Sequence, residues 1–248
     1  MQNEKVVLIT GAAKRVGATV ARSLHAHGMR VIIHYSTSSD QAHALRDELN
    51  QARPNSASCI QANLLDHATK LSQVIATAVE TWGQLDVLIN NASSFYPTPL
   101  GQITEENWED LIGTNLKAPL FLAQAAAPYL TKQQGCIINM VDIHAQQPLK
   151  SYPVYCAAKA GLLMLTKALA KELGPHVRVN AIAPGPVLWP DQQNELDKSM
   201  QEKIISRTLL KRPGSPEDIA KAVNFFIFQA GYVTGQILAV DGGRSLNF

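Results

Sequence analysis

The sequence has few cysteines, almost no net charge and no long apolar run, and each of these absences excludes a class of protein. Its three cysteines, Cys59, Cys136 and Cys156, form no CxxC motif and cannot all pair, which favours a reducing, cytoplasmic setting over a disulfide-rich secreted domain. The formal net charge is only +2 and no basic cluster is present, which argues against nucleic acid as a partner. The apolar runs fall far short of the ~20 residues of a membrane span, so we expect no membrane insertion.

Histidine is too scattered to suggest a metal site. Of the seven histidines, only His25 and His27 lie close together, and they fall on different faces of the expected helix. The N-terminus passes directly into a strand pattern at residues 5–9, which predicts no signal peptide. The 46% apolar fraction suffices for a large core, and no linker or repeat divides the 248 residues, so we expect a single domain over 1–248.

Short apolar runs alternate with segments of helix-forming residues along the whole chain. Strands are expected at residues 6–9, 30–35, 58–62, 85–89, 136–141, 177–182 and 236–240. Helices are expected from the first glycine turn to residue 27 and over residues 41–51, 66–82, 104–130 with a kink at Pro119, 155–173 and 219–229. This alternation predicts an α/β fold: a single-domain, Rossmann-like, doubly wound parallel sheet of about seven strands with helices on both faces.

A glycine turn joins the first strand to the first helix, which is the context that a phosphate-binding loop requires. Gly11 permits the tight turn, and Gly17 lets the helix approach the strand. Arg15 occupies the position of the middle glycine in the usual GxGxxG pattern. The sequence therefore predicts a dinucleotide site with one departure from the usual motif.

The end of the second strand indicates which dinucleotide is bound. A site for NAD carries an acid near this point to bind the ribose, whereas the sequence reads His34-Tyr35-Ser36 with no acid before Asp40. We expect Asp40 to cap or begin the next helix instead. The imidazole, the hydroxyls and Arg15 suit a 2′-phosphate, so we expect NADPH as the cofactor. The alternative is a polar loop that selects neither cofactor.

The residues that follow the expected strands meet at one edge of a parallel sheet, where such folds bind ligands. Gly11, the loop of Asn90 and Asn91, Asp142 and Pro184 all follow the ends of expected strands. Phe95 follows the Asn91 loop, where it can either stack on an aromatic substrate or cover the core. We therefore expect both cofactor and substrate at this edge.

Tyr155 and Lys159 lie four residues apart, and so on one face of their expected helix. A tyrosine has a pKa of about 10, and a nearby ammonium group favours the phenolate, which brings the proton closer to transfer at neutral pH. Asp142 ends the preceding strand and could add its carboxyl group. We interpret these three residues as a proton-donating site; the alternative is an ordinary exposed helix pair.

Two further segments predict features beyond the fold itself, a substrate lid and a contact with another subunit. Residues 186–210 are polar and edged by proline, which is typical of a mobile substrate lid, with Leu188 as a candidate substrate contact. The helix over 155–173 is apolar nearly all round, so its outer face is expected to meet another subunit.

Taken together, these residues make the whole chain resemble the short-chain dehydrogenase/reductase family. The motifs of that family occur in order at Thr10-Gly11 to Gly17, Asn90-Asn91-Ala92, Asn115, Tyr155-x-x-x-Lys159 and Pro184-Gly185. The resemblance implies that Tyr155 donates the proton, that Lys159 holds the nicotinamide ribose and lowers the tyrosine pKa, and that Asn115 supports a water relay. It also implies a homotetramer.

Within that family the chain resembles the pteridine reductase branch. Asp142 stands where a serine is usual, and Arg15 replaces the middle glycine. By this resemblance Phe95 and the nicotinamide would sandwich a pterin ring, while Ser93 and Arg15 would contact the pterin or the cofactor phosphates. Asp142 with Tyr155 would deliver a proton to a ring nitrogen. Further stretches that match this branch are residues 11–15, 34–35, 91–97 and 139–142.

The same resemblance implies the full set of ligand contacts, with no metal. The residues expected to bind NADPH are Gly11, Lys14, Arg15, Val16, Gly17, His34, Tyr35, Ser36, Asn63, Leu64, Asn91, Ala92, Ser93, Tyr155, Lys159, Pro184 and Gly185. The residues expected to bind substrate are Arg15, Ser93, Phe95, Asp142, Tyr155 and Leu188. The expected catalytic residues are Asn115, Asp142, Tyr155 and Lys159. Asn63 departs from the aspartate that the family often has beside the adenine.

The expected activity is NADPH-dependent reduction of dihydropterins, with dihydrofolate and oxidised pterins as further candidates. A pterin offers ring N–H donors to the carboxylate of Asp142, where a simple ketone offers only an acceptor. One alternative is a carbonyl reductase of the same family, against which Asp142 and Phe95 speak. Another is a non-catalytic NADPH-binding sensor, which would be expected to lack Tyr155 or Lys159.

Overall fold

The computed structural model describes residues 4–187 and 197–247. One sheet of seven parallel strands forms its centre, in the order β3-β2-β1-β4-β5-β6-β7. The strands are β1 Val6–Ile9, β2 Arg30–Tyr35, β3 Ala57–Gln61, β4 Val87–Asn90, β5 Cys136–Met140, β6 Arg178–Pro184 and β7 Ile237–Val240. The predicted doubly wound α/β fold is therefore confirmed.

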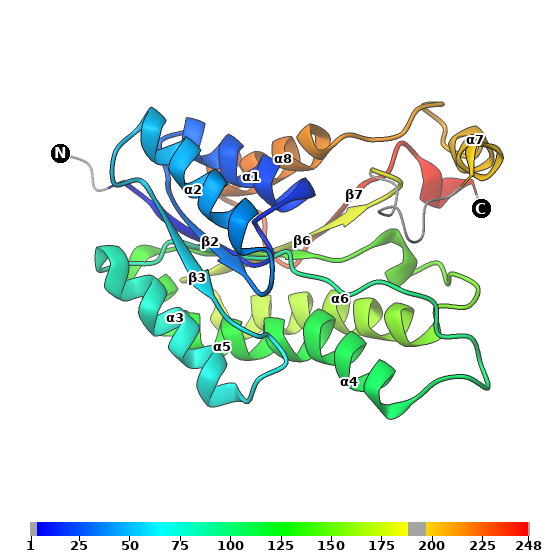
Figure 1. Ribbon diagram of the computed structural model, residues 1–248, viewed down its shortest axis with the longest axis horizontal. Coiled ribbons are helices and arrows are strands. Elements are labelled where there is room, and N and C mark those ends of the chain that lie inside the picture. Colours follow the sequence, from blue (N-terminus) through cyan, green and yellow to red (C-terminus); the bar gives the residue numbers. More distant parts are fainter. Residues whose placement is uncertain (1–3, 188–196, 248) are drawn as a thin grey trace.

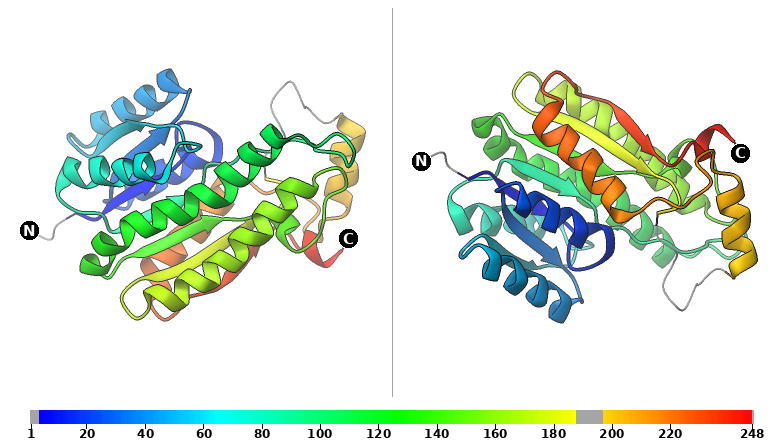
Figure 2. Two further views of the ribbon diagram at one scale, coloured as in Figure 1. Left: turned by 90° about the horizontal axis from the view of Figure 1, so that it is seen from below. Right: turned by 90° about the horizontal axis from the view of Figure 1, so that it is seen from above.

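Helices cover both faces of the sheet, as Figures 1 and 2 show. One face carries α1 (Arg15–Ala26), α2 (Ser39–Ala52) and α8 (Pro216–Asn224). The other carries α3 (Ala68–Trp82), α4 (Glu105–Ile112), α5 (Ala118–Gln133) and α6 (Pro153–Leu173). The remaining helix, α7 (Lys198–Ser206), lies beyond the sheet, beside the C-terminal end of the chain (Figure 1).

Two large apolar clusters hold these layers together, one on each face of the sheet. In β1, Val7 and Ile9 belong to the cluster beneath α1 and α8, whereas Val6 and Leu8 belong to the cluster beneath α3 and α5. All four side chains are fully buried. This explains why the strand reads as an unbroken apolar run, because a parallel strand packed on both faces has no polar side.

The fold creates its ligand crevice beside β1. This strand pairs in parallel with β2 on one side and with β4 on the other, and Ile9 lies opposite both Ile33 and Ile89. The helix that follows β1 covers one face, while those that follow β4 cover the other. The connections therefore diverge at the carboxyl ends of these strands, which is where ligands bind in open α/β sheets.

The predicted helix over residues 104–130 is confirmed as a helical segment from Glu105 to Gln133, but the form of the irregularity expected at Pro119 differs. A π-helical turn, Gly113–Lys117, separates α4 from α5, and the N–H of Ala118 donates to the carbonyl of Gly113 five residues earlier. Pro119 does not kink the middle of a helix; it lies in the first turn of α5. Because proline has no N–H, the carbonyl of Asn115 lacks its α-helical donor, and the wider turn accommodates that loss.

Part of the predicted lid is a regular helix. Within residues 186–210 the structure places α7, whereas residues 188–196, including Leu188, lie outside the described residues. Asp40 lies in the first turn of α2, as predicted. Among the described residues, no helix combines the length and the apolar character that crossing a bilayer requires.

Candidate active site

The turn after β1 has no room for a side chain at two positions, Gly11 and Gly17. Gly11 has a φ of +61°, and a Cβ there would lie 2.9 Å from the Cα of Ala92 in the loop after β4. A Cβ on Gly17 would lie 2.5 Å from the carbonyl oxygen of Gly11. Both contacts are closer than real Cβ atoms tolerate, so the turn and the start of α1 are packed against β4 by their glycines.

Arg15 begins α1 in a backbone conformation that favours glycine. Its φ is 56°, in the left-handed region, which costs a residue with a Cβ roughly 1–2 kcal/mol. This matches the sequence interpretation that Arg15 replaces a glycine of the usual motif. Its side chain is exposed and lines both cavities described below. A strained residue at the junction of two cavities is typical of a functional position.

His34 supports this turn from beneath. The N–H of Gly11 donates to Nδ1 of His34 at 3.2 Å, so the other ring nitrogen, Nε2, carries the proton and donates to the carbonyl of Ala62 at 3.2 Å. Burial lowers the pKa of His34 from 6.5 to about 4, so the ring is neutral at physiological pH. The expectation that its imidazole complements a 2′-phosphate is therefore not met; exposed Ser36 and Thr37 follow it at the rim.

A cavity of about 680 Å³ lies at the carboxyl edge of the sheet over these elements. It is lined by every residue expected to bind the dinucleotide, by Thr37 and Ser38, whose hydroxyls were expected to suit a 2′-phosphate, and by Val187, which had not been assigned to the cofactor. The N-cap of α1, Lys14, makes no side-chain cap hydrogen bond, so the N–H groups of the first turn are not satisfied by that side chain. A helix N-terminus of this kind suits a phosphate, and the residues present therefore fit a nicotinamide dinucleotide.

Asp142 and Tyr155 form a hydrogen-bonded pair at one end of this cavity. The hydroxyl of Tyr155 in α6 donates to Oδ2 of Asp142 at 2.7 Å, just beyond β5. The other carboxylate oxygen, Oδ1, accepts from the backbone N–H of His144 at 2.8 Å, which fixes the carboxyl group at the strand end. The two groups thus share one proton at a defined position.

The pKa of Tyr155 moves in the opposite direction to the one expected. Burial, with only 4% of the residue exposed, and the neighbouring charge of Asp142 raise this pKa well above its ordinary value of 10.0. The expected lowering by an ammonium group rested on the four-residue spacing, which does not reveal how deeply the helix face is buried. Tyr155 is therefore protonated at neutral pH and has a proton to donate, although the raised pKa makes that proton harder to release.

Lys159 is fully buried one helical turn further along α6. Its Nζ donates to the carbonyl of Met140 at 2.9 Å and lies 5.6 Å from the ring centre of Tyr155. Burial lowers the pKa of Lys159 from 10.5 to about 8, a shift that the charge of Asp142 opposes. The ammonium group therefore carries its charge at neutral pH while lining the dinucleotide cavity.

Asn115 binds the loop after β4 through its side chain. Its Nδ2 donates to the carbonyls of Ser94 and Leu111 at 3.0 and 2.9 Å, and its Oδ1 accepts from the hydroxyl of Ser93 at 2.7 Å. Asp110, which the sequence had not indicated, accepts from the hydroxyl of Ser94 at 2.9 Å. The side chain of Asn115 is thus used for positioning, which leaves its backbone carbonyl as the group suited to a water relay.

A second cavity, of about 770 Å³, opens beside the first. Arg15, Asp142, Tyr155 and Gly185 line both cavities, so the hydrogen-bonded pair of Asp142 and Tyr155 lies where the two meet. Phe95 lines the second cavity with 42% of its surface exposed.

An aromatic cluster forms one wall of this second cavity. The ring of Phe95 stacks on that of Tyr152 with centres 4.7 Å apart and planes inclined by 17°, and its edge-to-face contact with Tyr155 is at 4.8 Å. Tyr152 was missed by sequence reasoning, although it lies three residues before Tyr155 and so on the same side of the helix start. The wall offers a flat apolar surface beside the shared proton.

Comparison with known proteins agrees with this geometry. Residues 11–245 match the sequence model of a family described as enoyl-(acyl carrier protein) reductase. The chain is 38% identical to pteridine reductase 1 of Leishmania tarentolae, over 97% of this chain and 96% of that protein. It is 35% identical to a 3-oxoacyl-(acyl-carrier-protein) reductase of Staphylococcus aureus, over 98% of this chain and 99% of that protein.

A corresponding reductase of Staphylococcus epidermidis is also 35% identical, over 96% of this chain and 98% of that protein. These relatives extend over nearly the whole sheet and over both cavities. The chain therefore belongs to the short-chain dehydrogenase/reductase family and is an oxidoreductase.

Proposed function

We propose that this protein is an NADPH-dependent reductase of dihydropterins that also accepts dihydrofolate. The single observation that carries the proposal is the pair formed by Asp142 and Tyr155, 2.7 Å apart at the junction of the two cavities. A carboxylate at this point suits a substrate that donates ring N–H groups. The serine that is usual in the family suits the carbonyl oxygen of a ketone.

Asp142 and Tyr155 would share the work on the substrate. The carboxylate of Asp142 accepts a ring N–H of the pterin and orients it, while the hydroxyl of Tyr155 transfers its proton to the ring nitrogen that is reduced. NADPH, when bound, supplies the hydride for the adjacent carbon, so that the C=N bond becomes CH–NH. Tyr155 regains a proton from solvent by way of the hydrogen bond to Asp142.

The aromatic wall supports the same substrate class. Phe95 is held by Tyr152 on one side and by the edge of Tyr155, so it presents a fixed ring to the second cavity. Stacking on a flat heterocycle is worth roughly 0.5–1.5 kcal/mol beyond the burial of its area. Asn115 and Asp110 hold the adjoining loop through Ser93 and Ser94, so that the wall is preorganised.

Arg15 and the hydroxyls after β2 support NADPH over NADH. Arg15, Ser36, Thr37 and Ser38 all line the first cavity, and α2 begins directly after Ser38. The N-cap of α2, Ser38, makes no side-chain cap hydrogen bond, so the hydroxyl is available to a phosphate. A charge-assisted bond from a guanidinium group fits the additional phosphate of NADPH.

The relatives favour a second candidate, a reductase of 3-oxoacyl groups. The 35% identity to such reductases over nearly the full chain is close to the 38% identity to the pteridine reductase. Asp142 at the proton-donating position and the Phe95 wall weigh against this candidate, because neither is needed for a ketone.

We also propose that the protein is a homotetramer. The outer face of α6 carries small or apolar side chains at Ala157, Ala160, Met164 and Ala168, all exposed in the single chain, with Met164 at 61%. These positions follow a helical spacing and form one stripe. Light scattering at micromolar concentration is expected to give the mass of four chains, and Met164→Glu is expected to yield smaller species. A wild-type monomer would contradict the proposal.

A substrate panel that follows NADPH oxidation tests the proposed activity. It compares dihydrobiopterin and dihydrofolate with acetoacetyl-coenzyme A and simple ketones at equal enzyme concentration. We expect the highest kcat/KM with a pterin. Efficient reduction of the ketones with none of the pterins would favour the 3-oxoacyl reductase instead.

A further inference from the structure

The outer part of the second cavity is strongly cationic. Of the described residues that line this cavity, five are lysine or arginine and one, Asp142, is acidic. That acid is already bound to Tyr155 at the inner end. The cations are Arg15, Lys150, Lys203, Arg207 and Arg244. The concentration is local, because the whole chain has a formal net charge of only +2.

Helix α7 presents a mixed face to the cavity. Four residues spaced as i, i+3, i+4 and i+7 line the cavity: Met200, Lys203 and Ile204 within α7, and Arg207 at its C-terminal end. They therefore form one stripe in which apolar and cationic side chains alternate. A ligand lying along this stripe would contact both apolar and cationic side chains.

Three of the cations that line this cavity form no ion pair with a described acid. Among the described residues, no acidic side chain forms an ion pair with Lys150, Lys203 or Arg207. Arg244 lies close enough to Arg207 for the two like charges to interact; burial and this repulsion lower the pKa of Arg244, and the charge of Asp241 opposes that shift. Holding like charges together at a cavity mouth costs free energy unless an anion binds between them.

We propose that the mouth of the second cavity, formed by Lys203, Arg207 and Arg244, is a subsite for an anionic substituent on the pterin, a carboxylate or a phosphate. This inference rests on the proposed pterin reductase activity and narrows its substrate class. The flat head of such a substrate would lie against Phe95, beside Asp142 and Tyr155, and its tail would extend past α7 to the cations. Among pterins, the anionic ones are therefore the preferred substrates.

Steady-state kinetics with matched substrates test this subsite. The substrates are dihydrobiopterin, whose tail is neutral, dihydrofolate, whose tail carries carboxylates, and a dihydropterin with a phosphate ester on its side chain. The variants are Lys203→Gln combined with Arg207→Gln, and the control Lys198→Gln, an exposed α7 lysine that does not line the cavity. The readout is the ratio of kcat/KM for each anionic substrate to that for dihydrobiopterin.

We expect the double variant to lower this ratio about 10-fold or more, through KM, and the control to leave it unchanged. Added salt should raise the wild-type KM for the anionic substrates far more than for dihydrobiopterin. A fall for only one anion would identify it as the ligand. Equal ratios in wild type and double variant would overturn the subsite alone. A wild type that reduces no pterin would overturn both the subsite and the proposed activity.

Discussion

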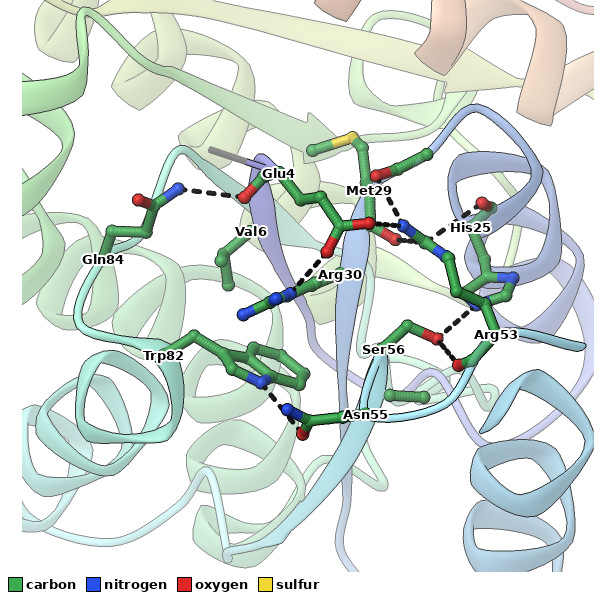
Figure 3. A network of polar contacts seen from close by, with 12 residues as sticks. Glu4, Val6, His25, Met29, Arg30, Arg53, Asn55, Ser56, Trp82 and Gln84 are labelled. Atoms are coloured by element: carbon green, nitrogen blue, oxygen red, sulfur yellow. Dashed lines mark hydrogen bonds and ion pairs between the residues drawn. The ribbon is translucent and has the colours of Figure 1, made fainter. Parts of the chain in front are cut away.

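Charged side chains at the two ends of the parallel sheet differ in the partners they have. At the amino end, Glu4 accepts from both Arg30, at 2.7 Å, and Arg53 (Figure 3). The guanidinium group of Arg30 also lies 5.5 Å from the ring centre of Trp82, and Arg53 donates to the carbonyl of Met29 at 2.5 Å. Glu4, Arg30 and Arg53 therefore all have partners within the chain.

At the carboxyl end the cations are arranged around cavities instead. Lys203 and Arg207 line the substrate cavity without an ion pair to any described acid, and Lys159 donates to a backbone carbonyl. Asp142, an acid at this end, is bound to a tyrosine rather than to a cation. The comparison shows that charges described at the amino end are paired within the fold, whereas Lys203 and Arg207 at the carboxyl end line a cavity without such a pair, as the proposed anion subsite requires.

The largest expected effect is on catalysis at the carboxyl end. Tyr155→Phe removes the proton donor but keeps the ring that contacts Phe95. We expect kcat to fall about 10²–10⁴-fold, the usual contribution of a positioned general acid, with little change in NADPH affinity. Stopped-flow measurement of NADPH oxidation and fluorescence titration of NADPH separate the two quantities. An active Tyr155→Phe enzyme would exclude this tyrosine as the donor.

A smaller effect is expected on cofactor choice. Arg15→Gly should lower the preference for NADPH over NADH about 10-fold or more, because a charge-assisted bond to the phosphate is lost. It should also raise the free energy of unfolding by roughly 1–2 kcal/mol, since glycine relieves the left-handed backbone.

Gln134→Gly provides the matched control for that variant at the amino end. Gln134 has a φ of 51° at the end of α5, just before β5, so the same relief should stabilise the protein. Its distance from the cavities predicts no change in cofactor choice. The comparison uses kcat/KM for both cofactors and urea denaturation. An unaltered NADPH preference in Arg15→Gly would remove Arg15 from the phosphate site.

The smallest effect is expected at the amino end and concerns stability only. Hydrogen bonding to Arg30, and the charge of Arg53, lower the pKa of Glu4 below its ordinary value of 4.5. A carboxylate with a lowered pKa stabilises the folded state above its unfolded pKa, and this contribution is lost as the pH falls through the lowered value.

Glu4→Gln should therefore reduce the free energy of unfolding at pH 7 by about 1 kcal/mol, because the Glu4 side chain is 36% exposed and solvent screens the pair. The deficit should shrink as both proteins are compared at increasingly acidic pH, while kcat/KM at pH 7 stays at the wild-type value. Thermal unfolding across this range is the measurement. A loss of activity without a loss of stability would contradict the claim that Glu4, at the amino end, serves stability only.

Local patterns in the sequence were enough to predict the fold. The apolar run at Arg30–Tyr35 is bounded by Gly28 and by hydroxyl residues, and β2 has those same limits. Residues that follow strands were also brought together correctly, because parallel topology places the carboxyl ends of strands at one edge. That rule gathered Gly11, Asn91 of the loop that begins at Asn90, Asp142 and Pro184 around one cavity.

Properties that depend on burial and on distant contacts could not be predicted in this way. The raised pKa of Tyr155 and the neutral state of His34 follow from how deeply each side chain is enclosed, which spacing does not report. The π-helical turn at Gly113–Lys117 needs both the missing N–H of Pro119 and the packing of α5. The cationic mouth combines α7 with Arg244, and nothing in their separation along the chain joins them.

The replacement Asp142→Ser tests the central claim most directly, with kcat/KM measured for dihydrobiopterin and NADPH affinity measured separately. The account predicts a fall of about 10²-fold or more in kcat/KM, since the carboxyl group that orients the ring nitrogen and shares the proton of Tyr155 is lost, while NADPH still binds. Full pterin reduction by the Asp142→Ser enzyme would contradict the account and leave an ordinary carbonyl reductase as the better description.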